Sequence, residues 1–334
     1  MPARAPTLAP ASLSAPAVLS SVLLPLVPVI LCIGLGFVTA RVGWVRASAI
    51  PDLSNLVFLV LTPALLFRTM GQVRLQELDF QPVALYFGAV ALLFALTLAF
   101  TRFSTRAAAR ALAHTFGNLV MIGVPLVGLV YGPQGLVTLF TLVSLHSLVL
   151  LTAATLVFEL AEARELQRSG QAEPRPMAHT VWQAVRNSII HPVPLPILAG
   201  LLYAQTGWTL PQALDKPLQV VGSALGPMAL LLVGIALAHT RIGAHWRDAV
   251  RIAAVKNLAL PVVLGLMAWA LGLSGPAIAV MFTAAAMPVG ANVLLFTQRY
   301  RVMQDEVSSS IAISAALALV TLPAALLLAQ GFMR

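Results

Sequence analysis

The sequence contains little charge for its length. Only 9% of its 334 residues are charged and 59% are hydrophobic, with a mean hydropathy of +0.92. An average soluble domain has about 25% charged residues, so this chain cannot cover a globular surface with charge. The shortage excludes an ordinary soluble enzyme, and the high hydrophobicity excludes a disordered chain. Long apolar runs in place of short alternating segments predict an all-α polytopic membrane protein.

Cysteine is almost absent, and carboxylates are absent from the middle of the apolar runs. The single cysteine, Cys32, excludes a disulfide framework and a cysteine metal cluster. Without Asp or Glu in the middle of a run, a carboxylate proton relay of the pump type is not expected. We therefore predict no metal site and no cofactor.

The excess of positive charge has a simple interpretation. The net charge of +9 comes from 18 arginines and 2 lysines. Because these residues lie mostly between the apolar runs, we interpret them as anchors at the lipid bilayer and not as a nucleic-acid surface.

The apolar runs are long enough for ten membrane crossings, since a crossing helix needs about 20 apolar residues. The uncharged runs cover residues 17–40, 53–67, 82–101, 111–158, 187–214, 217–240, 257–298 and 307–333. The two longest runs each hold two crossings, separated by turns at 131–135 and 273–276. The short second run is expected to extend over 49–70, and the eighth span to begin near Ala249.

Arginine and lysine are distributed unevenly between the two sides of the membrane. Alternate loops place fourteen of them on one side and five on the other, with Lys256 inside a span. The richer side is cytoplasmic by the positive-inside rule, so both termini are predicted to be extracytoplasmic. Residues 1–16 then form an extracytoplasmic tail, and residues 162–186 form a cytoplasmic linker.

The chain contains a weak internal repeat. Three prolines recur in the second half at offsets of 166, 164 and 163 residues. The pairs are Pro28 and Pro194, Pro63 and Pro227, and Pro125 and Pro288. Each half, residues 17–161 and 187–334, holds five predicted spans. Because five is odd, the second half enters the membrane upside down, which predicts two inverted five-helix repeats of the kind found in secondary transporters.

The fourth and ninth spans are predicted to be broken near their middle. Gly123 and Pro125 interrupt the fourth span, and Pro288 and Gly290 interrupt the ninth. Proline removes a backbone donor, and in hydrocarbon the freed groups must line a cavity or find partners. We predict that broken crossover helices 4 and 9 meet at the membrane midplane, where their half-helix N-termini suit an anion.

Few ionisable side chains lie near the middle of the predicted spans, and two asparagines accompany the helix breaks. Asn118 and Asn292 lie near the two breaks, and each either contacts the substrate or forms an interhelical hydrogen bond. His146, deep in the fifth span, either bonds to a neighbour or takes part in substrate contact or proton coupling. His114, one turn before Asn118 on the same helix face, and Lys256, which can extend toward the cytoplasm, are accessory candidates.

Several segments resemble those of the auxin efflux carrier family, which includes plant PIN-type carriers and bacterial permeases for malonate or other organic anions. The segments, within residues 25–323, are Leu-Thr-Pro-Ala-Leu-Leu-Phe at 61–67, Phe-Gly-Asn at 116–118, Ile-Gly-Val-Pro-Leu at 122–126, Pro-Met-Ala-Leu-Leu-Leu-Val-Gly at 227–234, Ala-Met-Pro through Asn at 286–292 and Arg-Tyr at 299–300. The order and spacing of these segments carry the resemblance.

The resemblance implies a scaffold of spans 1, 2, 6 and 7, and a transport domain of spans 3–5 and 8–10. It implies that substrate binds where spans 4 and 9 cross, with Pro125 and Pro288 as crossover prolines and the two asparagines near the carboxylate. It also implies a homodimer, elevator-like motion and, for a bacterial member, the inner membrane. His146 stands where the plant carriers have Gln, and their large central loop is missing, which argues against auxin itself.

These features predict a secondary active transporter of a small organic anion, such as a malonate-like, malate-like or auxin-like carboxylate. The alternative is a transporter like the bile acid–sodium symporters, which share the inverted five-span plan. A channel is less well supported, because the sequence shows no filter or ring of charge. An enzyme is not expected, since H-E-x-x-H and paired intramembrane aspartates are absent. Proton and sodium coupling are both open, and sodium would have to bind carbonyls and Asn, Ser or Thr oxygens.

Overall fold

The protein is all-helical in the part of the chain that the structure describes. The computed structural model describes residues 24–74, 76, 78–169, 182 and 193–333. The predicted tail 1–16 lies outside these residues, as do residues 170–181 and 183–186 of the predicted linker. The first eight residues of that linker, 162–169, continue the preceding helix.

Six helical segments are long and apolar enough to cross a membrane. They are Ala47–Met70, Gln81–Phe100, Leu119–Arg168, Gln212–His239, Trp246–Ala270 and Gln304–Met333. Three shorter apolar helices accompany them, namely Leu26–Arg41, Pro194–Gln205 and Pro276–Ala285. Since about 20 apolar residues span the hydrocarbon core, the chain is a multi-pass membrane protein.

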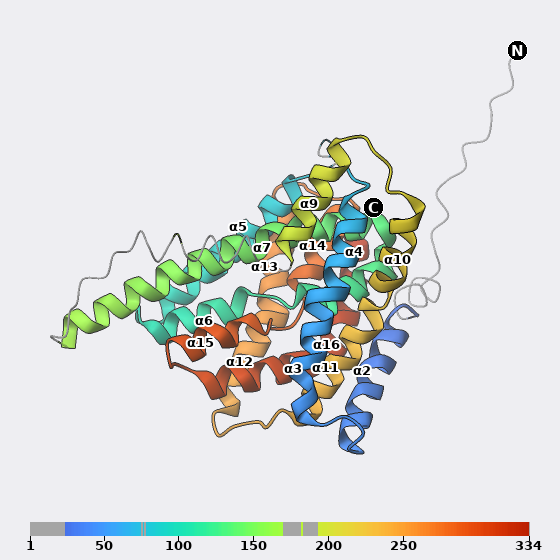
Figure 1. The fold of residues 1–334 in the computed structure, drawn as a ribbon. Helices are drawn as coiled ribbons and strands as arrows, with labels where there is room; N and C mark the ends of the chain where they lie inside the picture. Colours follow the sequence, from blue (N-terminus) through green and yellow to red (C-terminus); the bar gives the residue numbers. More distant parts are fainter. Residues whose placement is uncertain (1–23, 75, 77, 170–181, 183–192, 334) are drawn as a thin grey trace, which may run out of the picture.

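The helices follow one another closely along the chain (Figure 1). In order they are α2 (Leu26–Arg41), α3 (Ile50–Leu56), α4 (Thr62–Met70), α5 (Gln81–Phe100), α6 (Thr105–Thr115), α7 (Val124–Ser169), α9 (Pro194–Gln205), α10 (Gln212–Ser223), α11 (Leu225–His239), α12 (Trp246–Ala254), α13 (Leu260–Ala270), α14 (Pro276–Ala285), α15 (Asn292–Arg299) and α16 (Gln304–Ala329). Three π-helical turns, Val57–Leu61, Leu119–Gly123 and Val255–Ala259, precede α4, α7 and α13.

The predicted turns between spans are found where glycine adopts a positive φ. Gly132 has a φ of 65° and divides α7 into two helices, within the predicted turn 131–135. Gly272 and Gly275 have φ values of 65° and 111° and separate α13 from α14, at the predicted turn 273–276. Residues with a Cβ rarely adopt these angles, so glycine fixes both reversals. The helix that corresponds to the predicted eighth span begins at Trp246, three residues before the predicted start.

A proline follows each π-helical turn as the second residue of the next α-helix. These prolines are Pro63, Pro125 and Pro261. Proline lacks an N–H and crowds the carbonyl four residues earlier, and the wider π turn relieves this conflict without ending the helix. The predicted break at Pro125 is therefore misplaced: the helix runs through Pro125, and the break lies at residues 116–118.

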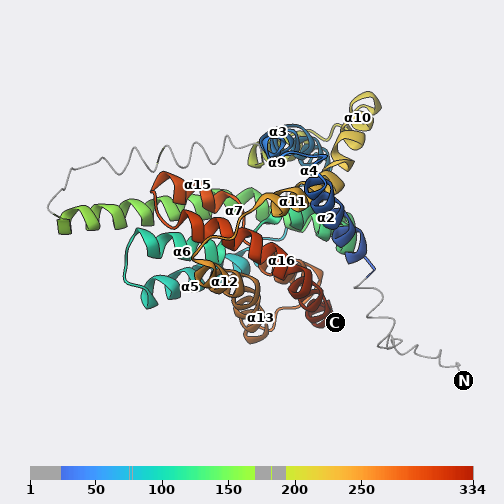
Figure 2. The same ribbon diagram turned by 90° about the horizontal axis from the view of Figure 1, so that it is seen from below.

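The helices form two groups that lie side by side (Figures 1 and 2). One group holds α2, α3, α4, α9, α10 and α11, in which α2 packs along α11 and α4 packs against α9 and α10. The other holds α5, α6, α12, α13, α14, α15 and α16, in which α12 packs along α16 and α5 along α6 and α13. Helix α7 packs against α6 and α14 and also contacts α9 and α11, so it joins the two groups.

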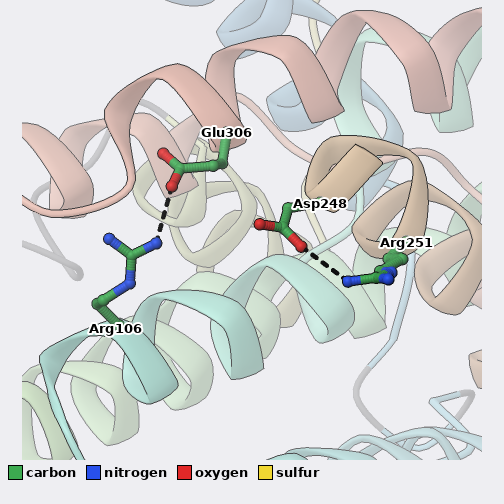
Figure 3. Close-up of polar contacts among 4 residues, drawn as sticks. All are labelled: Arg106, Asp248, Arg251 and Glu306. Carbon is green, nitrogen blue, oxygen red and sulfur yellow. Dashed lines mark hydrogen bonds and ion pairs between the residues drawn. The ribbon is translucent and has the colours of Figure 1, made fainter. Parts of the chain in front are cut away.

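An ion pair connects α6 to α16 (Figure 3). The Arg106 guanidinium donates to the Glu306 carboxylate at 2.9 Å, and the Glu306 side chain is only 6% exposed. Removing the arginine leaves a buried carboxylate without this partner, which costs more than an exposed pair is worth. We expect Arg106→Ala to lower the free energy of unfolding by about 1–3 kcal/mol, seen as a lower melting temperature in detergent.

The same view contains a matched control. Arg251 donates to Asp248 at 3.2 Å within α12, and the Arg251 side chain is 79% exposed (Figure 3). Exposed pairs of this spacing contribute little, so Arg251→Ala is expected to change stability by less than about 0.5 kcal/mol. Equal melting temperatures for the two variants would contradict a structural role for the Arg106–Glu306 pair.

Candidate functional site

Two helix breaks cross in the interior of the protein. Helix α6 ends at Thr115, and α14 ends at Ala285, with six residues between it and the start of α15. The Asn118 N–H donates to the Pro288 carbonyl at 2.8 Å, and the Gly290 N–H donates to the Phe116 carbonyl at 2.9 Å. Backbone groups at membrane depth need partners when a helix is interrupted. The two breaks supply these partners to each other.

The crossing is close because two glycines lie in it. A Cβ added to Gly290 would lie 2.7 Å from the Phe116 ring and 3.0 Å from the Gly117 carbonyl oxygen. A Cβ added to Gly117 would lie 3.4 Å from the Lys256 Nζ. Glycine thus permits the close backbone approach that the antiparallel bridge between Gly117 and Val289 requires.

Two helix N-termini meet at a cavity of about 50 Å³ beside this crossing. One begins at Leu119, where the Asn118 side-chain oxygen accepts from the Met121 N–H at 3.2 Å. The other begins at Asn292. The cavity is lined by Phe58, Phe116, Gly117, Asn118, Leu119, Val120, Met121, Val143, His146, Ser147, Val193, Gly290, Ala291 and Asn292. The N-terminus of a helix is the positive end of its dipole, so two such ends at one cavity attract an anion.

His146 lies in the wall of the cavity without a hydrogen-bond partner. The side chain is 3% exposed, and within the described part of the chain neither ring nitrogen is paired. Its ring packs against Phe116 and Tyr86, with centroid distances of 4.6 and 5.8 Å, and the Tyr86 hydroxyl is unpaired as well. The structure therefore does not support a histidine bonded to a neighbour. A buried polar group without a partner is costly, and a ligand in the cavity would supply one.

Lys256 brings a positive charge to the crossing, outside the lining of the cavity. It is fully buried, and its Nζ donates to the Ala285 and Met287 carbonyls at 2.8 and 2.6 Å. The expectation that this side chain extends toward the cytoplasm is wrong, because the carbonyls at the end of α14 hold it inside. Among the described residues, no Asp or Glu lines the cavity. The local electrostatics thus favour a negative ligand.

His114 is not part of the cavity. Its ring nitrogen Nδ1 lies 3.0 Å from the Thr97 hydroxyl oxygen, and the residue is 7% exposed. Helix α6 ends one residue after His114. The prediction that His114 and Asn118 share one helix face is therefore wrong, because Asn118 lies beyond the helix. The contact with Thr97 gives His114 a packing role between α5 and α6.

The structure brings four of the seven predicted binding residues to the cavity and leaves three outside its lining. Asn118, His146, Gly290 and Asn292 line it. The other three, Gly123, Pro125 and Pro288, do not, although the Pro288 carbonyl accepts the bond that holds the crossing. Pro125 instead borders a separate apolar cavity of about 320 Å³ between α2, α7, α10 and α11.

Several lining residues have no counterpart among the predicted ones. Phe58 and Val193 come from the group of helices that does not contain the crossing, and Ser147 follows His146. Phe116 and Gly117 belong to the Phe-Gly-Asn segment. Their position directly before Asn118 was the signal in the sequence that could have identified them as lining residues. Within the described ranges, no three His, Cys, Asp or Glu side chains gather in a way that could hold a metal ion.

Comparison with known proteins agrees with a transport role. A family model described as "Membrane transport protein" matches residues 21–326. "Auxin efflux carrier component 8" of Arabidopsis thaliana is 23% identical over 241 residues, which cover 61% of this chain and 66% of the plant protein. "Putative malonate transporter" of Rhizobium meliloti (strain 1021) is 26% identical over 308 residues, which cover 89% of this chain and 92% of that protein.

The family match extends over nearly the whole described chain and includes both helix breaks, the cavity and Lys256. The family description and the names of both relatives are those of transporters and not of enzymes. The chain therefore belongs to this family of membrane transport proteins, the auxin efflux carrier family.

Proposed function

We propose that this protein is a secondary active transporter that carries a small organic anion across the membrane by alternating access. One observation carries the proposal. The two breaks bond to each other through Asn118 and Gly290, and they direct two helix N-termini at one cavity without a carboxylate. Half-helices of this kind bind anionic substrate groups in secondary transporters.

The proposed architecture has ten spans in two inverted repeats of five. The first repeat comprises α2, α3 with α4, α5, α6 with the first part of α7, and the remainder of α7. The second comprises α9, α10 with α11, α12 with α13, α14 with α15, and α16. In this scheme residues 17–161 and 187–334 are the repeats, joined by the cytoplasmic linker 162–186 and preceded by the extracytoplasmic tail 1–16.

We assign the two helix groups to the two domains of an elevator-type transporter, a scaffold and a moving domain. The group of α2, α3, α4, α9, α10 and α11 is the fixed scaffold, and the other group moves against it together with α7, which continues the first half of the crossing and carries His146. Phe58 and Val193 of the scaffold line the cavity that the crossing forms. Movement of the crossing past these side chains would open the cavity to one side of the membrane and then to the other.

The size of the cavity favours a small substrate. Its volume is about 50 Å³, whereas pockets for drug-sized ligands hold about 300–1,000 Å³. A carboxylate of malonate size suits it better than an indole acid, and the relative that covers more of this chain is named for malonate. The proposed setting is the inner membrane of a bacterium, with the protein as a homodimer and both termini extracytoplasmic.

Uptake into proteoliposomes tests the proposal. Purified protein is reconstituted, and labelled malonate, malate and indole-3-acetate are offered under imposed pH, sodium and voltage gradients, with empty liposomes as the control. We expect gradient-dependent accumulation of a small carboxylate, with malonate preferred over the indole acid. Absence of uptake of all three carboxylates above the level of empty liposomes would overturn the anion site. Equilibration of the carboxylate without any gradient dependence would contradict active transport.

A further inference from the structure

Lys256 is the most buried charge among the described residues, and it lies outside the lining of the cavity. It is 0% exposed. Its Nζ contacts the carbonyl oxygens of Ala285, the last residue of α14, and of Met287, inside the break. The end of a helix presents carbonyls without intrahelical partners and a partial negative charge.

Such a cluster of carbonyls is a cation site. In secondary transporters, unwound backbone carbonyls and half-helix C-termini coordinate the coupling Na⁺. Here the lysine ammonium fills that position at 2.8 and 2.6 Å from the two oxygens. The cation is thus attached to the chain and does not have to be taken up from solution.

The segment that carries Lys256 is fixed to the break by further bonds. Lys256 lies in the π-helical turn Val255–Ala259, next to Asn257, whose side-chain nitrogen donates to the Ser314 carbonyl at 2.9 Å. The Ser314 hydroxyl accepts from the Val289 N–H, inside the break, at 2.8 Å. The lysine is therefore held at the crossing from two sides, which suits a permanent part of the site.

We propose that Lys256 is a resident cation that occupies the carbonyl site at the end of α14, so that this protein works without sodium. The ammonium balances the helix end and keeps the crossing positive for an anion throughout the cycle. The statement about transport rests on the proposed function. The statement about the carbonyl site does not, since it concerns the folded protein alone.

Three variants in detergent test the carbonyl site without any substrate. Lys256→Ala removes the ammonium and leaves room for an ion, Lys256→Met removes it and fills the space, and Lys216→Ala removes the only other lysine, which is exposed in α10. Melting temperatures are measured in sodium chloride and in choline chloride at equal ionic strength. We expect wild type and Lys216→Ala to melt alike in both salts. Lys256→Ala should melt lower in choline and gain about 5 °C in sodium, and Lys256→Met should melt lower in both.

Each outcome decides the matter. Sodium stabilisation confined to Lys256→Ala supports a resident cation. Stabilisation of the wild type by sodium overturns it, as does an alanine variant that ignores sodium or cannot be recovered folded in either salt. In proteoliposomes, the wild type should take up malonate at the same rate in sodium and in choline, and Lys256→Ala only in sodium. An absence of malonate uptake in wild type would count against the proposed function, while the melting temperatures still decide the carbonyl site.

Discussion

Replacing Gly234 by alanine is expected to leave little folded protein. A Cβ at this position would lie 2.0 Å from the Ile33 carbonyl oxygen and 2.7 Å from the Phe37 nitrogen, both backbone atoms of α2. The contact is reciprocal, because a Cβ on Gly36 would lie 2.1 Å from the Leu231 carbonyl oxygen of α11. Small residues allow membrane helices to approach this closely. Helices α2 and α11 would have to separate along their whole contact, at a cost of about 3 kcal/mol or more.

Gly34 on α2 provides the matched control, because a Cβ there meets nothing within 4 Å. We expect Gly34→Ala to match wild type in folded yield by size-exclusion chromatography and in melting temperature, while Gly234→Ala loses most of both. Equal behaviour of the two variants would contradict the close packing of α2 on α11, and with it the integrity of the proposed scaffold.

Asn118→Asp is expected to abolish anion transport while preserving the fold. Asn118 accepts from the Met121 N–H at the start of a helix, and aspartate caps such a position as well as asparagine does. A negative charge is also favourable beside a helix N-terminus. The same charge would lie in the cavity wall and repel a carboxylate. We expect malonate uptake to fall about 100-fold or more, because like charges about 4 Å apart repel strongly away from bulk water.

Asn118→Asp is informative because it is expected to lower malonate uptake without lowering the stability of the protein. Asn55→Asp, at an exposed position of α3 that does not line the cavity, serves as the control and should keep wild-type uptake. The alanine variants Asn118→Ala and Asn292→Ala should lose transport too. Wild-type malonate uptake by Asn118→Asp would mean that the anion does not bind at this helix N-terminus.

The broad plan of the fold was predictable because it depends on local chemistry. Apolar length gave the membrane class, and glycines at positive φ gave the turns near Gly132 and Gly275. The location of the fourth-span break was not predictable from Pro125 alone. A proline in a long apolar helix leads either to a break or to a π turn, and tertiary contacts decide between them. Here Asn118 starts the half-helix, and Pro125 lies inside it.

The site was predictable where residue type determines the role, and not where distant contacts do. Asn118, His146 and Asn292 were identifiable as rare polar groups in apolar spans, and the structure brings them to one cavity. The position of Lys256 was not, because its partners are backbone carbonyls about thirty residues away in the chain. Every residue has a backbone carbonyl, so residue types in the sequence do not show which carbonyls the lysine contacts. The prediction for His114 was wrong for a different reason. Helix periodicity was applied from His114 to Asn118, across the point where the helix ends.

The central claim is that one anion binds beside the crossing of the two broken helices, and protection of a single cysteine tests it most directly. In a Cys32→Ser background, Ala291→Cys places a thiol at an exposed position of the cavity wall, and Thr206→Cys places one in the exposed turn after α9. The rate of modification by a charged thiol reagent is measured with and without malonate. We predict that malonate at ten times its dissociation constant slows modification of Ala291→Cys about tenfold and leaves Thr206→Cys unchanged. Unaltered modification of Ala291→Cys in a variant that still transports malonate would contradict the claim.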